Sequence, residues 1–219
     1  MLLLICRSDN YTCRYNKNGA AIASYNCLMK ENPSQQELDW LHRILKNDEQ
    51  ALALLMRRYY SDLYNYAARF TQDDQLIKDC IQEVFISLWQ RRQTVGVILS
   101  PKFYFLRAIK NKVLKSLDSM HRKMGQQLPP EDYHFYHEFS IEKIIIAREV
   151  SDENAARLKA ILALLSKREK EVVYLKYYQY LDNGQIAELM NVNRQSVYNL
   201  LHEAIRKLKE LWHREFITR

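Results

Sequence analysis

The stretch that decides the fold of the C-terminal third is DNGQIAELMNVNRQSVYNLLHEAIRKL, residues 182–208. Its apolar side chains recur every three or four positions on both sides of Asn191, which predicts two helices joined by a tight turn. Ala187 is small where two helices must cross closely, and Val192 and Val197 are placed to fill the core between them. Asn191 tolerates the left-handed backbone that such a turn often needs. The pattern predicts a helix-turn-helix.

The outward face of the second of these helices carries basic, amide and hydroxyl side chains that can bond phosphates and base edges. A helix of this kind docks with its N-terminus in the major groove. The candidate DNA-binding residues on this face are Arg194, Gln195, Ser196, Tyr198, Asn199, His202 and Arg206. For this segment taken alone, a plain helical bundle with a polar exterior remains an alternative.

The rest of the chain also has helical patterning. Its 219 residues include only 4 Gly and 4 Pro, fewer turn residues than a sheet-rich fold requires. Helical spacing and capping residues predict helices that begin near Gln36, Asp48, Asp73, Ser100, Asp152 and Ser166, the last running to about Tyr178. No segment alternates like a strand over any length. We expect an all-α fold with two small helical domains joined by a flexible linker, the C-terminal one a helix-turn-helix.

A basic stretch precedes the linker. The formal net charge is +7, and residues 101–125 contain seven Lys or Arg and one acidic residue. Within residues 102–112, aromatic side chains alternate with cations, a composition that suits single-stranded nucleic acid. Phe105 is better explained as core, whereas Tyr104 fits a core position and a stacking position equally. Lys102 and Tyr104 lie near the start of this helix, and Arg107, Lys110 and Asn111 lie on its more polar side.

The N-terminal segment differs from the rest. Three of the four cysteines precede Met29 and only Cys80 follows it, which is typical of a reduced, cytosolic protein. We hypothesise that the natural start is Met29, and the alternative, a genuine extension over residues 1–28, stays open. The expected domains are an N-terminal tail (1–35), a first helical domain (36–122), a linker (123–150) and a second helical domain (151–219).

Several functional classes are disfavoured. The sequence has no Gly-rich phosphate loop, no metal-ligand spacing and no nucleophile motif, so we expect no enzyme, no metal and no cofactor. No apolar run approaches about 18 residues, so we expect no membrane insertion.

Three segments together resemble bacterial RNA polymerase sigma factors of the extracytoplasmic-function (ECF) subfamily. The sequence at 64–70 and 79–89 resembles the helices of the family that bind core polymerase. The sequence at 104–111 resembles its −10 recognition and melting helix, and the sequence at 165–208 its −35-binding domain. The matching parts cover roughly residues 36–120 and 150–212.

The resemblance implies roles for particular residues. Those matching the polymerase-docking helix are Asp79, Gln82, Glu83, Phe85, Leu88 and Trp89, although the spacing of Phe85 and Leu88 is also ordinary core spacing. Those matching the −10 helix are Lys102, Tyr104, Arg107, Lys110 and Asn111, and the −35 residues are the seven already named. The loop Gln93–Ser100 would capture a flipped base, with no single residue assigned. Two departures from the family pattern are Asn191, where a glycine is often found, and Glu203, where a basic residue is common.

The implied function is a cytoplasmic sigma factor that binds core RNA polymerase, recognises −10 and −35 promoter elements and melts DNA to start transcription. The implied partners are core polymerase, promoter DNA and an anti-sigma factor, which is often membrane-anchored in this family. The main alternative is a two-domain regulator of the LuxR type, which shares the opening Ser-Lys-Arg-Glu-Lys-Glu at 166–171. Such a regulator normally carries strands in its other domain. An α-helical adaptor without DNA binding is a further alternative.

Overall fold

A computed structural model describes residues 35–123 and 152–217, all within one compact unit, Glu31–Arg219. Every regular element in these two ranges is a helix, and neither range contains a strand. The expected all-α fold is therefore confirmed over the described residues. The hypothesis of a start at Met29 and the expected linker lie outside them.

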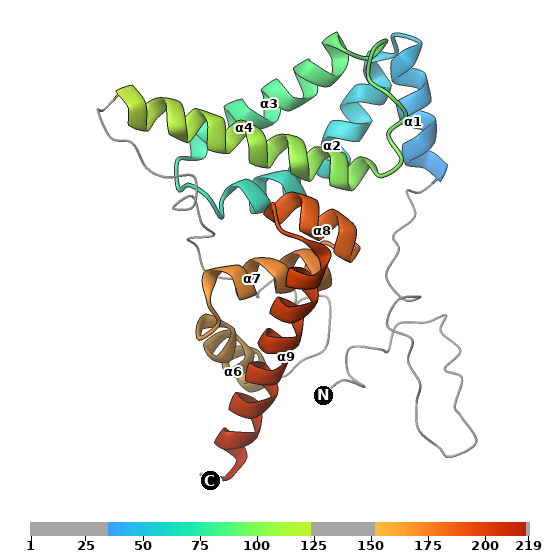
Figure 1. Ribbon diagram of the computed structural model, residues 1–219. Coiled ribbons are helices and arrows are strands. Elements are labelled where there is room, and N and C mark those ends of the chain that lie inside the picture. The colour runs from blue at the N-terminus through green and yellow to red at the C-terminus, as the bar shows by residue number, and fades with distance from the viewer. Residues whose placement is uncertain (1–34, 124–151, 218–219) are drawn as a thin grey trace, which may run out of the picture. The chain divides into compact units, whose positions relative to one another are not determined.

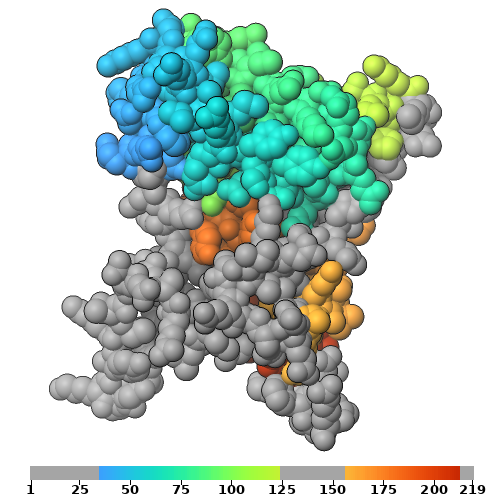
Figure 2. All heavy atoms as spheres, turned by 180° about the vertical axis from the view of Figure 1, so that it is seen from behind, coloured from blue at the N-terminus to red at the C-terminus, as the bar shows by residue number. Residues whose placement is uncertain are grey.

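The first helical group comprises α1 (Gln35–Leu45), α2 (Glu49–Ala67), α3 (Asp74–Gln90) and α4 (Pro101–Lys123). Helices α2, α3 and α4 all contact one another, and α1 packs against α2 (Figure 1). Seen from behind, α1 to α3 form one continuous surface, coloured blue to green (Figure 2). The largest fully buried side chains of this group are Ile44, Leu55, Leu63, Tyr66, Ile77, Ile81, Leu88, Phe105, Leu106 and Ile109.

Local capping chemistry sets the starts of these helices. The Asp48 carboxylate accepts hydrogen bonds from the backbone N–H groups of Gln50 (2.9 Å) and Ala51 (3.1 Å). Asp73 accepts one from Leu76 (3.0 Å). These bonds satisfy amides that have no partner inside the helix. Helix α4 begins at Pro101, where the missing N–H of proline costs nothing.

The second helical group comprises α6 (Asp152–Ala163), α7 (Lys167–Val173), the π-helical turn η3 (Tyr174–Tyr178), α8 (Asn183–Met190) and α9 (Arg194–Ile217). The long helix α9 contacts α6, α7 and α8 (Figure 1). At the start of α7, Glu169 N–H donates to Ser166 Oγ (3.3 Å), and Ser166 N–H donates to the Glu169 carboxylate (2.8 Å). The predicted capping box is therefore present.

The predicted helix from Ser166 to about Tyr178 changes type before its end. After Val173 the chain widens into the π-helical turn, and the Gln179 N–H donates to the Tyr174 carbonyl five residues earlier (3.0 Å). A π-helical turn of this kind shifts the register of the side chains that follow it. The apolar spacing at 174–178 suited either helix type, so the sequence did not distinguish them.

Candidate nucleic-acid interface

The turn between α8 and α9 has the predicted geometry. Asn191 adopts a left-handed backbone (φ 53°, ψ 48°), and the Val192 N–H donates to the Ala187 carbonyl (2.9 Å). Asn193 then caps α9, because its side-chain oxygen accepts from the Ser196 N–H (2.7 Å). Val197 and Ala187 are buried where the two helices meet, and Val192 is half-buried. These contacts hold α8 and α9 as a helix-turn-helix.

Helix α9 carries all seven predicted −35 residues. Ser196 is half-buried and the other six, Arg194, Gln195, Tyr198, Asn199, His202 and Arg206, are exposed. The Gln195 side-chain amide donates to the Asn199 side-chain oxygen (3.1 Å), which orients two of the predicted base-reading groups together. A Cβ built on Gly184 would lie 3.0 Å from the Arg194 guanidinium, so this glycine leaves room for the arginine.

Arg206 is more constrained than its neighbours. Its guanidinium pairs with Glu203 one turn before it and with Glu210 one turn after it (Nη1 to Oε1, 2.6 Å). Hydrogen bonds from Arg206 to these two carboxylates raise its pKa above the usual arginine value. A DNA phosphate must therefore compete with two carboxylates for this side chain. One of these two carboxylates is Glu203, where the family pattern commonly has a basic residue.

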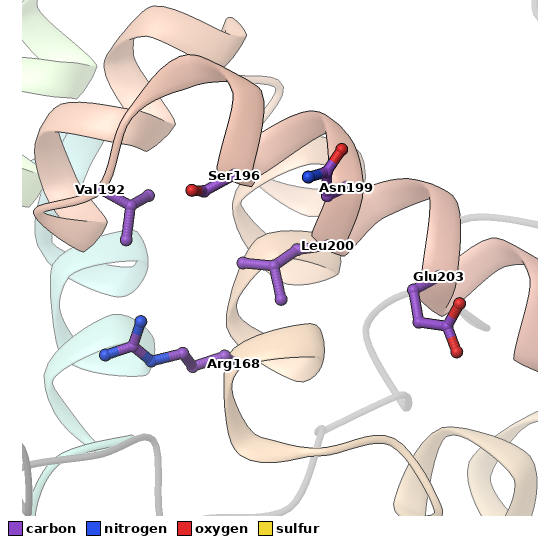
Figure 3. A pocket seen from close by; sticks show the side chains of 6 residues that line it. All are labelled: Arg168, Val192, Ser196, Asn199, Leu200 and Glu203. Carbon is purple, nitrogen blue, oxygen red and sulfur yellow. The ribbon is translucent and has the colours of Figure 1, made fainter.

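A hollow beside α9 adds one residue that sequence reasoning missed. Arg168 is exposed in the first turn of α7, and its side chain extends along the hollow to below Val192 (Figure 3). The hollow combines an apolar floor with amide, hydroxyl and charged groups at its edge. Its lining residues are Arg168, Val192, Ser196, Asn199, Leu200 and Glu203. The sequence signal was the Lys167-Arg168 pair directly after the capping residue, a position from which a cation can contact a backbone phosphate.

The aromatic residues of α4 belong mainly to the core. Phe105 is fully buried, with its ring centroid 5.1 Å from that of Tyr59 and 4.9 Å from that of Phe85. Tyr104 is half-buried and lies edge-on to Phe105 (5.3 Å, 79°). Burial raises the pKa of the Tyr104 hydroxyl. The core assignment of Phe105 is thus correct, and Tyr104 offers only part of its ring for stacking.

Lys110 of α4 contacts the second helical group. Its Nζ donates to Glu171 Oε1 (2.9 Å) and to the carbonyl oxygen of Leu189 (2.8 Å). Leu189 lies in the last turn of α8, where the helix dipole favours a cation. Sequence reasoning assigned no role to Glu171.

Two other predicted DNA-binding cations of α4 also contact the second helical group. Arg107 forms an ion pair with Glu188 of α8, and the Lys102 ammonium lies 5.8 Å from the centroid of the Tyr180 ring. Asn111, the remaining polar candidate on α4, is exposed. The three cations among the predicted −10 residues of α4 are therefore all in contact with the second helical group.

The predicted polymerase-docking residues of α3 separate into two sets. Asp79, Gln82 and Glu83 are exposed, and Trp89 is half-buried. Phe85 and Leu88 are 3% and 1% exposed and lie in the hydrophobic core, which corrects their assignment as contact residues. Their three-residue spacing places them on the face of α3 that packs against α2 and α4, whereas the acidic residues lie on the opposite side.

The exposed acids of α3 also have partners in the fold. Glu83 forms an ion pair with Lys112 of α4, and Asp79 accepts a hydrogen bond from Gln75 (2.9 Å). Both are surface interactions, which contribute little to stability and are easily exchanged for a partner's charges.

Among the helices that the structure describes, none has the length and hydropathy needed to cross a bilayer.

Comparison with known proteins assigns both helical groups. The family "Sigma-70 region 2" matches residues 55–123, and "Sigma-70, region 4" matches residues 155–208. A similar curated protein is the ECF RNA polymerase sigma factor SigL of Mycobacterium tuberculosis. It is 24% identical over 174 residues, covering 73% of this chain and 89% of the relative.

Two solved structures are also similar. One is CnrH in complex with the cytosolic domain of CnrY (TM-score 0.48, 16% identity, 81% of this chain and 97% of the other). The second is the sigma factor RpoE with the anti-sigma factor NepR from Bartonella quintana (TM-score 0.47, 14% identity, 77% and 98%).

Proposed function

The chain belongs to the ECF subfamily of bacterial RNA polymerase sigma factors, and we propose on this premise how its residues divide the work of promoter recognition. The protein binds core RNA polymerase, recognises −10 and −35 promoter elements and melts DNA to start transcription. Sigma factors are initiation factors without enzymatic activity, so the work is done by binding alone. The observation that carries the division of roles is the presence of a region 2 bundle and a region 4 helix-turn-helix in one chain.

Helix α9 reads the −35 element in this proposal. Arg194, Gln195 and Asn199 are exposed in its first two turns, the part of a recognition helix that reaches base edges. Arg suits guanine, and Asn and Gln suit adenine, in the major groove. Ser196, Tyr198, His202 and Arg206 line the same face, and Arg168 adds a phosphate contact beside it.

Helix α4 and the loop before it open the −10 element. Lys102, Arg107 and Lys110 hold phosphates, with Tyr104 and Asn111 beside them. In the loop Gln93–Ser100, the Val97 and Leu99 side chains are 89% and 80% exposed. Apolar side chains of this kind act as wedges at unstacked base steps, and extruding a base costs a few kcal/mol that pocket contacts offset.

The exposed face of α3 binds core polymerase. Asp79, Gln82 and Glu83 supply polar contacts and Trp89 an apolar edge.

The proposed domain boundaries remain those of the sequence: tail 1–35, region 2 domain 36–122, linker 123–150 and region 4 domain 151–219. We place the protein in the bacterial cytoplasm with the polymerase, and family membership supports an anti-sigma factor as a further partner.

The test is runoff transcription with core RNA polymerase and a fragmented genomic template of the source bacterium. Discrete transcript starts that vanish without the protein support the proposal. Tight binding of the protein alone to duplex DNA, with no initiation, supports the LuxR-type regulator instead. Loss of binding at raised salt accompanies either DNA-binding function and excludes an adaptor that does not bind DNA.

A further inference from the structure

The chain between α3 and α4 is fastened at its start to the turn that joins α1 and α2. Arg92, just after the end of α3, donates from Nε to the side-chain oxygen of Asn47 (2.7 Å). Next to it, the Gln93 side-chain amide donates to the carbonyl oxygen of Leu45, the last residue of α1 (2.8 Å). The green connection from α3 to α4 accordingly passes close to α1 (Figure 1). These two bonds anchor one end of the loop Gln93–Ser100.

The Arg92 side chain is held in one orientation. Its guanidinium lies 4.3 Å from the centroid of the Trp89 ring, and its Nη1 donates to the Trp89 carbonyl oxygen (2.6 Å). The planar guanidinium therefore stacks on a ring and donates in two directions at once, which an ordinary flexible surface side chain does not do. The third contact, to Asn47, lies where this orientation directs it.

The turn that receives these bonds is itself fixed. Asn47 adopts a left-handed backbone (φ 64°), and its N–H donates to the carbonyl oxygen of Ile44 (3.0 Å), a residue that is fully buried. Asp48 then caps α2 and accepts a hydrogen bond from Arg43 Nε (2.9 Å). The Asn47 acceptor therefore has a defined place on the helical bundle, and it precedes the residues 55–123 that match Sigma-70 region 2.

Beyond the anchor, the loop divides its apolar side chains between the core and the surface. The Val95 N–H donates to the Arg91 carbonyl oxygen (2.8 Å), which closes a turn directly after α3. Val95 and Ile98 are half-buried and pack against the core, whereas Val97 and Leu99 are exposed. The anchor and the two core contacts together determine the place from which Val97 and Leu99 project.

We propose that Asn47, Arg92 and Gln93 are positioning residues for promoter melting, which hold the loop where Val97 and Leu99 can enter the opening −10 element. The proposal rests on the proposed function, which assigns this loop to the −10 element. A loop that is ordered before it binds does not lose conformational entropy when it binds. Without the anchor, only a fraction of molecules has the loop in place when the duplex begins to open. Helix α1 and its turn thus act on melting without touching DNA.

The left-handed backbone of Asn47 allows a clean pair of variants. Asn47→Gly removes the acceptor and keeps the backbone conformation, because glycine adopts positive φ freely. Asn47→Asp keeps a side-chain oxygen for Arg92 and also tolerates this conformation, so it is the conservative rescue. Gln93→Ala removes the second bond of the anchor. The matched control is Gln50→Ala, which removes an exposed amide in the first turn of α2.

The experiment separates binding of the promoter from its melting. Each variant is assembled with core RNA polymerase and tested on a promoter found by runoff transcription. Promoter affinity is measured at low temperature, where the duplex stays closed, and the melting rate as the appearance of permanganate-reactive thymines at saturating holoenzyme. We expect Asn47→Gly and Gln93→Ala each to slow melting by about five-fold, the effect of losing one ordinary hydrogen bond. We expect closed-promoter affinity to be unchanged, and Asn47→Asp and the control to melt DNA at the wild-type rate.

The base preference at the −10 element distinguishes positioning from a general loss of folded protein. Misfolding lowers the active fraction equally on every promoter, so the ratio of melting rates on cognate and base-substituted −10 elements stays constant. A displaced loop lowers that ratio, and we expect it to fall in Asn47→Gly and to recover in Asn47→Asp. Wild-type melting rates and base preference in both Asn47→Gly and Gln93→Ala would overturn the anchor. Failure of the proposed function is a different result, because the wild-type holoenzyme itself would then melt no promoter.

Discussion

At the scale of single residues, the helix-turn-helix depends on the backbone of Asn191. A left-handed conformation is costly for residues with a Cβ and least so for Gly, Asn and Asp. We expect Asn191→Ala to lower the free energy of unfolding of the full chain by about 1 kcal/mol, whereas Asn191→Gly leaves it nearly unchanged. Urea unfolding followed by circular dichroism measures both. An equal loss in the two variants would show that the amide, not the backbone conformation, matters.

Glu169 makes region 4 sensitive to acid. Burial opposes its ionisation, but hydrogen bonds from Lys207 and Ser166 outweigh burial and hold the pKa of this carboxyl below its usual value. The folded pKa is thus lower than the unfolded pKa. The stability that the carboxylate contributes is therefore complete above the ordinary glutamate pKa of about 4.3 and is lost as pH falls through the folded pKa.

Thermal unfolding of wild type and Glu169→Gln across pH measures this contribution. We expect the difference in Tm to be constant near neutral pH and to shrink below about pH 4. Glu210→Gln, which alters an exposed carboxylate of α9, serves as the control. A difference between wild type and Glu169→Gln that grows as the pH falls would contradict the sign of the shift.

At the scale of elements, α9 carries promoter specificity in the proposed division of roles. Alanine at Arg194, Gln195 or Asn199 should each cost about 1–3 kcal/mol on the cognate −35 element. Because Gln195 and Asn199 are hydrogen-bonded to each other, their losses should be non-additive. Holoenzyme binding to promoter fragments with substituted −35 bases measures the effect. An unchanged base preference in the triple variant would remove the assignment.

In the same proposal, helix α3 presents its exposed acids to the polymerase. The double variant Asp79→Asn/Glu83→Gln should weaken binding to core polymerase by about ten-fold, because interfacial charges guide and hold the encounter. Asp39→Asn, an exposed carboxylate that pairs with Arg43 of its own helix, is the control. Competition against a labelled sigma factor for core measures both. Equal losses in the double variant and the control would place the polymerase contact elsewhere.

Helix starts could be predicted from the sequence because their chemistry is local. The capping residues Asp48, Asp73, Ser166 and Asn193 bond amides two or three positions away, and each was recognisable without a fold. The side of α3 that is buried was harder to predict. Phe85 and Leu88 fit both a docking edge and a core face, and only the packing of α2 and α4 against α3 decides between them.

At the scale of the whole molecule, the contact between region 2 and region 4 could not be predicted from the sequence. Lys110 and Glu171 are 61 residues apart, and nothing local marks either one as the partner of the other. The basic stretch was correctly recognised as the main concentration of charge. The cations of this stretch pair with acidic side chains of region 4 because the two helical groups pack against each other. Sequence periodicity carries no information about that packing.

The contact also separates two effects of substituting the α4 cations. In free protein, loss of Lys102 or Arg107 removes both a proposed DNA contact and a contact with region 4. If core polymerase separates the two helical groups, only the proposed DNA contact is lost in the holoenzyme. Experiments on the −10 function of α4 therefore belong in the holoenzyme.

The most direct test of the central claim is permanganate footprinting of the holoenzyme on a promoter found by runoff transcription. Unpaired thymines react with permanganate, so the reagent reports melted DNA. We predict reactive thymines upstream of the start site with wild-type protein and without nucleotides, and at least a ten-fold weaker signal with Lys102→Ala/Arg107→Ala although the −35 element stays protected from nuclease. Full melting by the double variant, or no melting by wild type, would contradict the account.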